Sequence, residues 1–333
     1  MGSRMQFYRH ERPFVLDSGS VLDRVTIGYH TYGQLNAKGD NVVWICHALT
    51  ANSDAAEWWS GVVGAGKVID TRRYFVVCAN ILGSCYGTEA DLFSGETPLL
   101  ITIRDMVRAH VLLREHLGIA RVCLLMGGSM GGYQVLEWAL QEPSVIGQMF
   151  LIGSAASESA WGVAIHTAQR LAIEADPTWN TGAPGSGEKG LMAARAIGMI
   201  TYRTYQQYVA AQSGPASQLE GFRAESYIRY QGHKLVRRFF ARNYWLLTKS
   251  MDSHNIGRGR GEDMEAVLRS MPQRSLVIGI DSDLLCPFVE QKFLAQHLPH
   301  AQLIGIDSMY GHDGFLTESA KISGYLSAWL AKG

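Results

Sequence analysis

The chain has 333 residues, and its 30 Lys and Arg residues balance its 30 Asp and Glu residues, so the formal net charge is zero. That length fits one large domain with an insertion or two small domains. The balanced charge argues against nucleic acid as a main partner, because phosphate binding needs a basic surface. No apolar run reaches the roughly 18 residues of a membrane span, and no signal peptide is visible before Phe14, so we expect no membrane association.

The cysteines indicate a reducing environment. The chain has five of them, an odd number without framework spacing and without a CxxC pair, so neither a set of disulfides nor a zinc site is expected. Three lie inside apolar, strand-like runs and are interpreted as buried thiols: Cys46, Cys78 and Cys123. We therefore expect a cytoplasmic protein without a bound metal.

The N-terminal part of the chain predicts an alternation of strands and helices. Apolar runs predict strands at residues 25–33, 41–47 and 74–80, each followed by a turn or a loop. Apolar residues at helical spacing predict a helix over 103–117. Strands that alternate with helices favour a mostly parallel central sheet with helices on both faces.

The stretch from Gly127 to Gly132 indicates a sharp turn between a strand and a helix. A strand is predicted at 121–125 and a helix at 134–140, and glycines flank Ser129 between them. The pattern Gly-x-Ser-x-Gly is typical of a nucleophile elbow, in which the serine takes a positive φ angle and its hydroxyl lies above the sheet. The pattern alone also fits a plain glycine-rich turn, but the strand before it and the helix after it favour the elbow.

Residues 155–271 differ in pattern from the segments on either side of them. Helices dominate there, and those predicted span residues 162–175, 193–203 and 234–250. Strands flank this segment in the sequence and are predicted at 148–153, 275–280 and 302–306. We therefore expect a core formed by 1–154 and 272–333, with a helical lid inserted at 155–271. The lid should cover the carboxyl ends of the strands, where ligands bind in open α/β sheets.

A nucleophilic serine needs a base, and the base needs an orienting acid. In elbow-bearing folds the chain order is Ser, then Asp or Glu, then His. Asp283 and His312 each follow a predicted strand in that order, and they are the expected acid and base of Ser129. Asp281 ranks second as the acid because it directly adjoins its strand. The remaining candidates are interpreted as turn or solvated residues: Asp307, His297 and His300.

An oxyanion hole needs two N–H donors. We expect one from Met130, directly after the nucleophile, and one from the loop that follows the strand at 41–47. Leu49 is the first choice in that loop, with Ala48 and Thr50 as near alternatives. His47 is interpreted as a structural loop histidine rather than a chemical participant.

Several further motifs are distributed through nearly the whole chain. They include Cys46-His47-Ala48-Leu49-Thr50, Gly127-Gly128-Ser129-Met130-Gly131-Gly132, Ile200-Thr201-Tyr202-Arg203, Gly257-Arg258-Gly259-Arg260-Gly261 and Tyr310-Gly311-His312-Asp313. In these motifs the chain resembles the homoserine O-acetyltransferase family, within the α/β-hydrolase superfamily. The resemblance implies an α/β-hydrolase fold and transfer of an acetyl group from acetyl-CoA to the hydroxyl of L-homoserine, through a covalent Ser129 intermediate.

The resemblance also implies the remaining site residues. Arg203 would bind the substrate carboxylate, Asp313 the ammonium, and Tyr208 would line the site. Acetyl-CoA would be a co-substrate with no cofactor bound, and a homodimer through the lid helices is expected. Ala51 and Tyr133 depart from the residues common in the family. A succinyl-CoA donor, a serine acceptor, or an esterase or thioesterase using the same triad therefore stay open.

Overall fold

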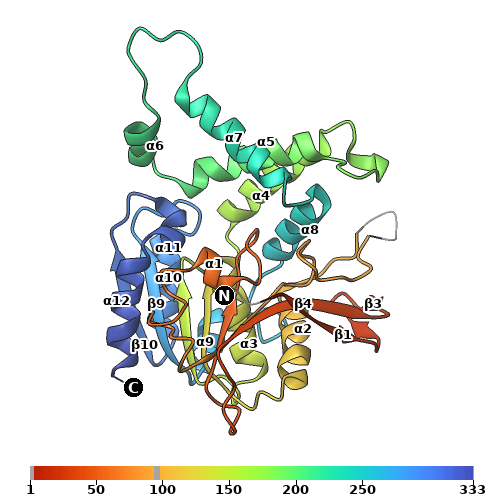
Figure 1. The fold of residues 1–333 in the computed structure, drawn as a ribbon, viewed down its shortest axis with the longest axis vertical. Coiled ribbons are helices and arrows are strands. Elements are labelled where there is room, and N and C mark those ends of the chain that lie inside the picture. The colour runs from red at the N-terminus through yellow and green to blue at the C-terminus, as the bar shows by residue number, and fades with distance from the viewer. Residues whose placement is uncertain (1–3, 94–97, 333) are drawn as a thin grey trace.

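The predicted strands assemble into one central sheet (Figure 1). In the computed structural model, which describes residues 4–93 and 98–332, this sheet has eight strands in the order β1-β4-β6-β5-β7-β8-β9-β10. β1 and β4 are antiparallel to their neighbours, and the strands from β6 to β10 in that order run parallel. Because parallel strands share one carboxyl edge, the loops that follow them meet above it.

The strands are β1 (Gln6–His10), β2 (Phe14–Val15), β3 (Val21–Leu22), β4 (Val25–Tyr32), β5 (Val42–Cys46), β6 (Phe75–Ala79), β7 (Val122–Gly128), β8 (Gln148–Ile152), β9 (Arg274–Ile280) and β10 (Ala301–Ile306). The strands from β4 to β10 lie close to the positions that the sequence predicts, whereas β1, β2 and β3 are not predicted. β2 and β3 form a separate two-stranded sheet within the described residues.

Helices follow most of these strands. Those of the core are α1 (Ala55–Trp58), α2 (Ile103–His116), α3 (Met130–Gln141), α9 (Met264–Arg269), α10 (Phe288–His297), α11 (Gly314–Thr317) and α12 (Ser319–Leu330). The others are α4 (Ala160–Glu174), α5 (Glu188–Tyr202), α6 (Tyr205–Gln212), α7 (Arg223–Val236) and α8 (Ala241–Asp252). Two 3₁₀ helices are also present among the described residues, η1 (Trp179–Thr181) and η2 (Gly311–Asp313).

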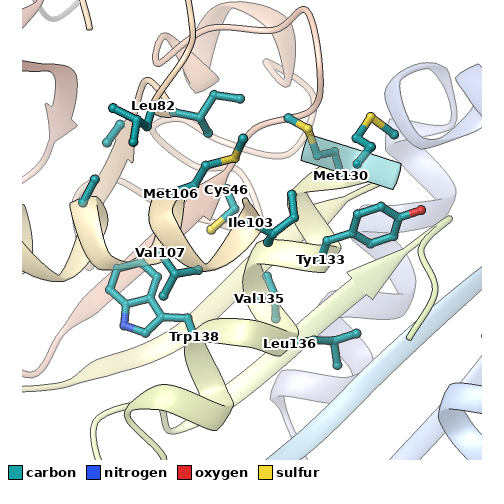
Figure 2. Close-up of a cluster of buried hydrophobic side chains, with 14 of the residues drawn as sticks. Cys46, Leu82, Ile103, Met106, Val107, Met130, Tyr133, Val135, Leu136 and Trp138 are labelled. Carbon is teal, nitrogen blue, oxygen red and sulfur yellow. The ribbon is translucent and has the colours of Figure 1, made fainter. Parts of the chain in front are cut away.

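The sheet separates two buried apolar clusters. Trp44 of β5 belongs to the first, whereas its neighbours Val43 and Ile45 belong to the second, as the alternating direction of strand side chains requires. Figure 2 shows part of the first cluster, in which Val107 of α2 lies beside Trp138 of α3. Burial on both faces explains why the parallel strands are continuous apolar runs.

The helices α4 to α8 form a separate layer beyond the carboxyl edge of the sheet (Figure 1). α4, α5, α7 and α8 pack against one another, while α9 packs against α10 of the core. The single helix predicted over 234–250 is wrong, because α7 ends at Val236 and α8 begins at Ala241. Phe239 in the intervening turn is buried at 1% exposure, and Phe240 takes an extended backbone. Burial of this ring thus interrupts a helical pattern that continues in the sequence.

None of the helices in the described part of the chain has both the length and the apolar character needed to cross a membrane.

Candidate active site

Ser129 occupies a sharp turn between β7 and α3. Its φ of 54° and ψ of −130° confirm the positive φ angle predicted for an elbow. A Cβ added at Gly127 would lie 2.3 Å from the backbone of Gly131, and one at Gly131 would lie 2.1 Å from the carbonyl oxygen of Cys46. A Cβ at Gly132 would lie 2.3 Å from Ser154 Oγ. Close backbone approach therefore requires glycine at 127 and 131, and the Ser154 side chain occupies the space beside Gly132.

Asp283 and His312 form a buried hydrogen-bonded pair. His312 Nδ1 lies 2.7 Å from Asp283 Oδ2, and the two residues are 3% and 4% exposed, respectively. The other carboxylate oxygen accepts hydrogen bonds from the N–H groups of Leu285 (2.8 Å) and Cys286 (2.9 Å). These bonds fix the orientation of the carboxylate. The structure thus places Asp283, rather than Asp281, against His312.

The surroundings of His312 favour its protonated form. Burial alone would lower the pKa of its imidazole, but the Asp283 charge and hydrogen bond, together with the Asp313 charge, outweigh burial and raise the pKa above its usual 6.5. The ring also packs against Phe315 and Tyr202, with centroid distances of 5.5 and 5.8 Å. A base oriented this way can accept a proton and hold the resulting charge.

The elbow follows β7, and the Asp283–His312 pair approaches the end of β8, the neighbour of β7. β7 is hydrogen-bonded to β8, with Gly128 opposite Ile152, and a Cβ at Gly153 would lie 3.4 Å from Asp283 Oδ2 and 3.6 Å from His312 Cε1. Over residues 4–93 and 98–332, Ser129 Oγ makes no hydrogen bond to His312. Hydrogen bonds between a nucleophile and its base are often long in free enzymes and shorten when the substrate binds. The absence of this bond is therefore compatible with Ser129 as a nucleophile that becomes acylated.

The two N–H groups predicted for an oxyanion hole are available. Met130 is the first residue of α3, where N–H groups have no partner within the helix. As far as the structure describes the chain, neither its N–H nor that of Leu49 donates a hydrogen bond to another residue. His47 fixes the loop: its Nδ1 donates to the Ala48 carbonyl (2.8 Å) and its Nε2 accepts from Ile81 N–H (3.1 Å). Burial lowers the pKa of His47 to about 4, so this ring is neutral.

Arg203 and Asp313 form an ion pair beside His312. Arg203 Nε lies 2.7 Å from Asp313 Oδ2, and the side chains are 18% and 15% exposed. The Nε–H is not aligned with a hydrogen-bond acceptor, so the contact is an ion pair. Arg203 ends α5, and its guanidinium lies 5.8 Å from the centroid of the Tyr310 ring. Asp313 directly precedes α11 at the N-cap position, but its side chain makes no capping hydrogen bond.

Tyr208 lies close enough to this ion pair to be influenced by it. Burial, more than the neighbouring Tyr227, raises the pKa of its hydroxyl to about 12, while the Arg203 charge acts in the opposite direction. The hydroxyl donates a hydrogen bond to the Met199 carbonyl of α5 (3.1 Å). Tyr208 therefore holds α6 against α5 near the Arg203–Asp313 pair.

Sequence reasoning missed a buried polar group next to the elbow. Tyr133 donates a hydrogen bond to Glu158 (3.1 Å), and its ring stacks on His254 at 4.0 Å. Burial raises the pKa of Glu158, and the Glu158 charge is one of those that raise the pKa of His312. The only available signal was the position of Glu158 after β8, on the same edge as the catalytic loops.

The Gly257–Gly261 motif belongs to the scaffold around the elbow helix. Arg260 makes two contacts of 2.7 and 3.1 Å with Glu137 of α3, which is 1% exposed, and Arg258 pairs with Asp17 at 2.8 Å. A buried carboxylate needs such partners. The motif thus holds α3 rather than lining the site.

The comparisons with known proteins agree with this geometry. The family model described as the alpha/beta hydrolase fold matches residues 41–319. The chain is 44% identical to the homoserine O-acetyltransferase of Trichormus variabilis, over 97% of this chain and 93% of that protein. It is 42% identical to the enzyme of the same name from Chlorobium chlorochromatii, over 98% of this chain and 95% of that protein.

Solved structures show the same fold. A homoserine O-acetyltransferase from Bacillus anthracis superimposes with a TM-score of 0.90 at 23% identity, over 99% of this chain and 98% of that chain. Esterase E22 superimposes with a TM-score of 0.89 at 21% identity, over 98% and 99% of the two chains. The chain therefore belongs to the homoserine O-acetyltransferase family of the α/β-hydrolase superfamily.

Proposed function

We propose that this protein transfers an acetyl group from acetyl-CoA to the hydroxyl of L-homoserine, a step of methionine biosynthesis. The observation that carries the proposal is the Arg203–Asp313 pair beside His312. An amino acid carries a carboxylate and an ammonium, which suit a guanidinium and a carboxylate, respectively. Hydrolysis by water needs neither charge, so the pair favours an amino-acid acceptor.

The first half-reaction acylates Ser129. Its hydroxyl oxygen attacks the thioester carbonyl while His312 Nε2 takes the hydroxyl proton, and Asp283 holds the imidazolium. The N–H groups of Met130 and Leu49 stabilise the tetrahedral oxyanion. The C–S bond then breaks, and the proton on His312 passes to the departing sulfur, so CoA leaves as a thiol.

The second half-reaction regenerates the serine. Homoserine binds with its carboxylate at Arg203 and its ammonium at Asp313, which separate from each other to contact it. His312 removes the proton of the substrate hydroxyl, whose oxygen attacks the acyl carbon. The bond to Ser129 breaks and the serine oxygen regains the proton from His312. One nucleophile thus serves both half-reactions in a ping-pong cycle.

The proposal also covers the cellular location and the oligomeric state of the enzyme. Five free cysteines are consistent with a cytoplasmic location. The outer lid carries exposed apolar side chains, including Ile200 (63%), Val209 (46%) and Tyr230 (56%). Such an accumulation favours a homodimer through the lid helices.

The test is release of CoA from acetyl-CoA with and without L-homoserine, compared with L-serine as acceptor and succinyl-CoA as donor. We expect rapid release only with acetyl-CoA and homoserine together, and O-acetylhomoserine as product. Equal release without an amino acid would instead identify a thioesterase, and a preference for succinyl-CoA or serine would replace the donor or the acceptor.

A further inference from the structure

We propose that the turn between α7 and α8 binds the phosphates and the purine of the acyl-CoA donor, an inference that rests on the function proposed above. The residues concerned, called the basic turn, lie in this turn and in the adjoining helix ends: Lys234, Arg237, Arg238 and Arg242. No acidic residue lies between His233 and Asn243 in a chain whose net charge is zero. CoA carries a diphosphate and a 3′-phosphate, which such a turn would attract.

The basic turn contacts the loops above the carboxyl edge of the sheet. Arg238 Nη1 donates to the Thr50 carbonyl and to the Tyr86 hydroxyl, at 2.5 Å each, and Asn243 Nδ2 donates to the Gly83 carbonyl at 2.8 Å. These loops follow β5 and β6, and β5 is the neighbour of β7, which carries the elbow. With strands about 4.8 Å apart, these loops begin on the order of 10 Å or less from Ser129.

The amino-acid site lies on the other side of the elbow. Asp313 follows β10, and the strands β8, β9 and β10 extend from β7 in the direction opposite to β5 and β6. With the amino-acid subsite at Arg203 and Asp313 on that side, the thioester of the donor can reach Ser129 from above β5 and β6. The pantetheine arm would then pass the oxyanion loop and reach the basic turn.

A cavity adjoins the basic turn. It has a volume of about 270 Å³, and its lining includes Pro184, Glu188, Phe240 and Arg242. Phe240 is 62% exposed although it is large and apolar, so its ring is free to stack on a purine. The Glu188 carboxylate could accept a hydrogen bond from the exocyclic amine of adenine. Arg242 would contact a phosphate at the same end of the cavity.

Two of these arginines are free to bind a phosphate. Where the structure describes the chain, Arg237 and Arg242 make no ion pair with an acidic residue. Arg229 of α7 instead pairs with Glu225 at 3.0 Å, and both are largely exposed. Arg229 is therefore a control for the removal of a positive charge elsewhere in the lid.

The experiment compares acetyl-CoA with S-acetylpantetheine, which has the same thioester but no nucleotide, as donors to homoserine. In the Arg237→Gln/Arg242→Gln variant we expect the ratio of kcat/KM between these donors to fall by about 10- to 100-fold, since charged contacts partly screened by water are lost. Arg229→Gln should keep the wild-type ratio. Binding of adenosine 3′,5′-bisphosphate, measured by calorimetry, should weaken only in the double variant.

Other outcomes overturn the assignment. An unchanged donor ratio in the double variant, or an equal fall in Arg229→Gln, would show that the basic turn does not bind the nucleotide. A wild-type protein that uses neither thioester would refute the proposed function instead. In that case the binding of adenosine 3′,5′-bisphosphate still tests whether the basic turn binds the nucleotide, because binding requires no turnover. Weaker binding in the double variant supports the assignment, and unchanged binding rejects it.

Discussion

Replacing Arg203 by alanine should impair only one of the two half-reactions. In the proposed cycle the first involves the thioester and Ser129, whereas the second needs the amino acid held with its hydroxyl near the acyl carbon. Arg203 and Asp313 are only 18% and 15% exposed, so their charges are poorly screened by water. Loss of one charge-assisted contact with its partner left unpaired costs about 2–4 kcal/mol, or about 30- to 1000-fold in kcat/KM for homoserine.

The same change should alter the pH dependence of acylation in a defined direction. The Asp313 charge already contributes to the raised pKa of His312. Without Arg203 that charge is no longer neutralised, so the pKa of His312 should rise further. Since the base must be neutral to accept a proton, the acid limb of the pH–rate profile should move to higher pH. Arg203→Lys should keep this limb near its wild-type position, yet restore transfer only partly, because an ammonium cannot contact a carboxylate through two parallel bonds.

Rapid-quench acylation by acetyl-CoA and steady-state transfer to homoserine, measured on the same preparations above the acid limb, test this reasoning. Acylation should stay near the wild-type rate while transfer falls. Arg229→Ala, an exposed lid arginine 72% accessible at its side chain, controls for a general effect of charge removal. If acylation fell as much as transfer in Arg203→Ala, Arg203 would serve the CoA half-reaction or lid integrity, and its assignment to the acceptor carboxylate would be rejected.

Four further substitutions test the elbow and its partners. Ser129→Ala should lower acyl transfer by about 10⁴- to 10⁶-fold with an unchanged circular dichroism spectrum; near-normal turnover would exclude a covalent intermediate. Asp283→Asn should lower kcat by about 10⁴-fold by favouring the wrong imidazole tautomer, while Asp281→Asn has little effect; the reverse ranking in a kinetic assay would identify Asp281 as the acid. Gly131→Ala should lower Tm by at least about 4 °C, because its Cβ would lie 2.1 Å from the Cys46 carbonyl oxygen; an unchanged Tm in calorimetry would contradict this crowding.

The sequence predicts the core better than the lid for a physical reason. A strand buried on both faces must be a continuous apolar run, so β5, β6, β7 and β9 are recognisable from composition alone. The elbow is recognisable because its positive φ and close backbone contacts demand glycines at fixed positions. In such segments the local sequence and the tertiary environment impose the same requirement.

In the lid, the local sequence and the tertiary environment do not impose the same requirement. The helical pattern continues through 234–250, and only the packing of Phe239 against Tyr86 and Tyr244, with centroids at 5.7 and 6.3 Å, determines where the chain turns. α7 begins at Arg223 after Phe222, which provides no side-chain cap. Neither the turn at Phe239 nor the start of α7 at Arg223 leaves a periodic signal in the sequence, because both depend on residues distant in the sequence.

The same distinction applies to the site. Strand ends and chain order indicate Ser129, Asp283 and His312, since each follows a strand whose carboxyl end lies at one edge. Nothing local indicates that Arg203 contacts Asp313 across the lid and the core; the family resemblance implied only that each of them binds the substrate. The Tyr133–Glu158 hydrogen bond likewise joins two segments through packing and has no sequence pattern of its own.

The Arg203–Asp313 pair also bears on how one fold supports both hydrolysis and transfer. The triad by itself does not choose between water and an alcohol, because either can deprotonate through His312 and attack the acyl carbon. In the free protein Arg203 and Asp313 neutralise each other's charge at 2.7 Å. Neither the thioester nor water therefore meets an unpaired charge at this pair. A zwitterion can replace both partners at once, and its hydroxyl then lies at a high effective concentration beside the base. The ratio of O-acetylhomoserine to acetate formed from one acylated preparation measures this preference, and it should fall in Arg203→Ala and Asp313→Asn while hydrolysis of the acyl-enzyme persists.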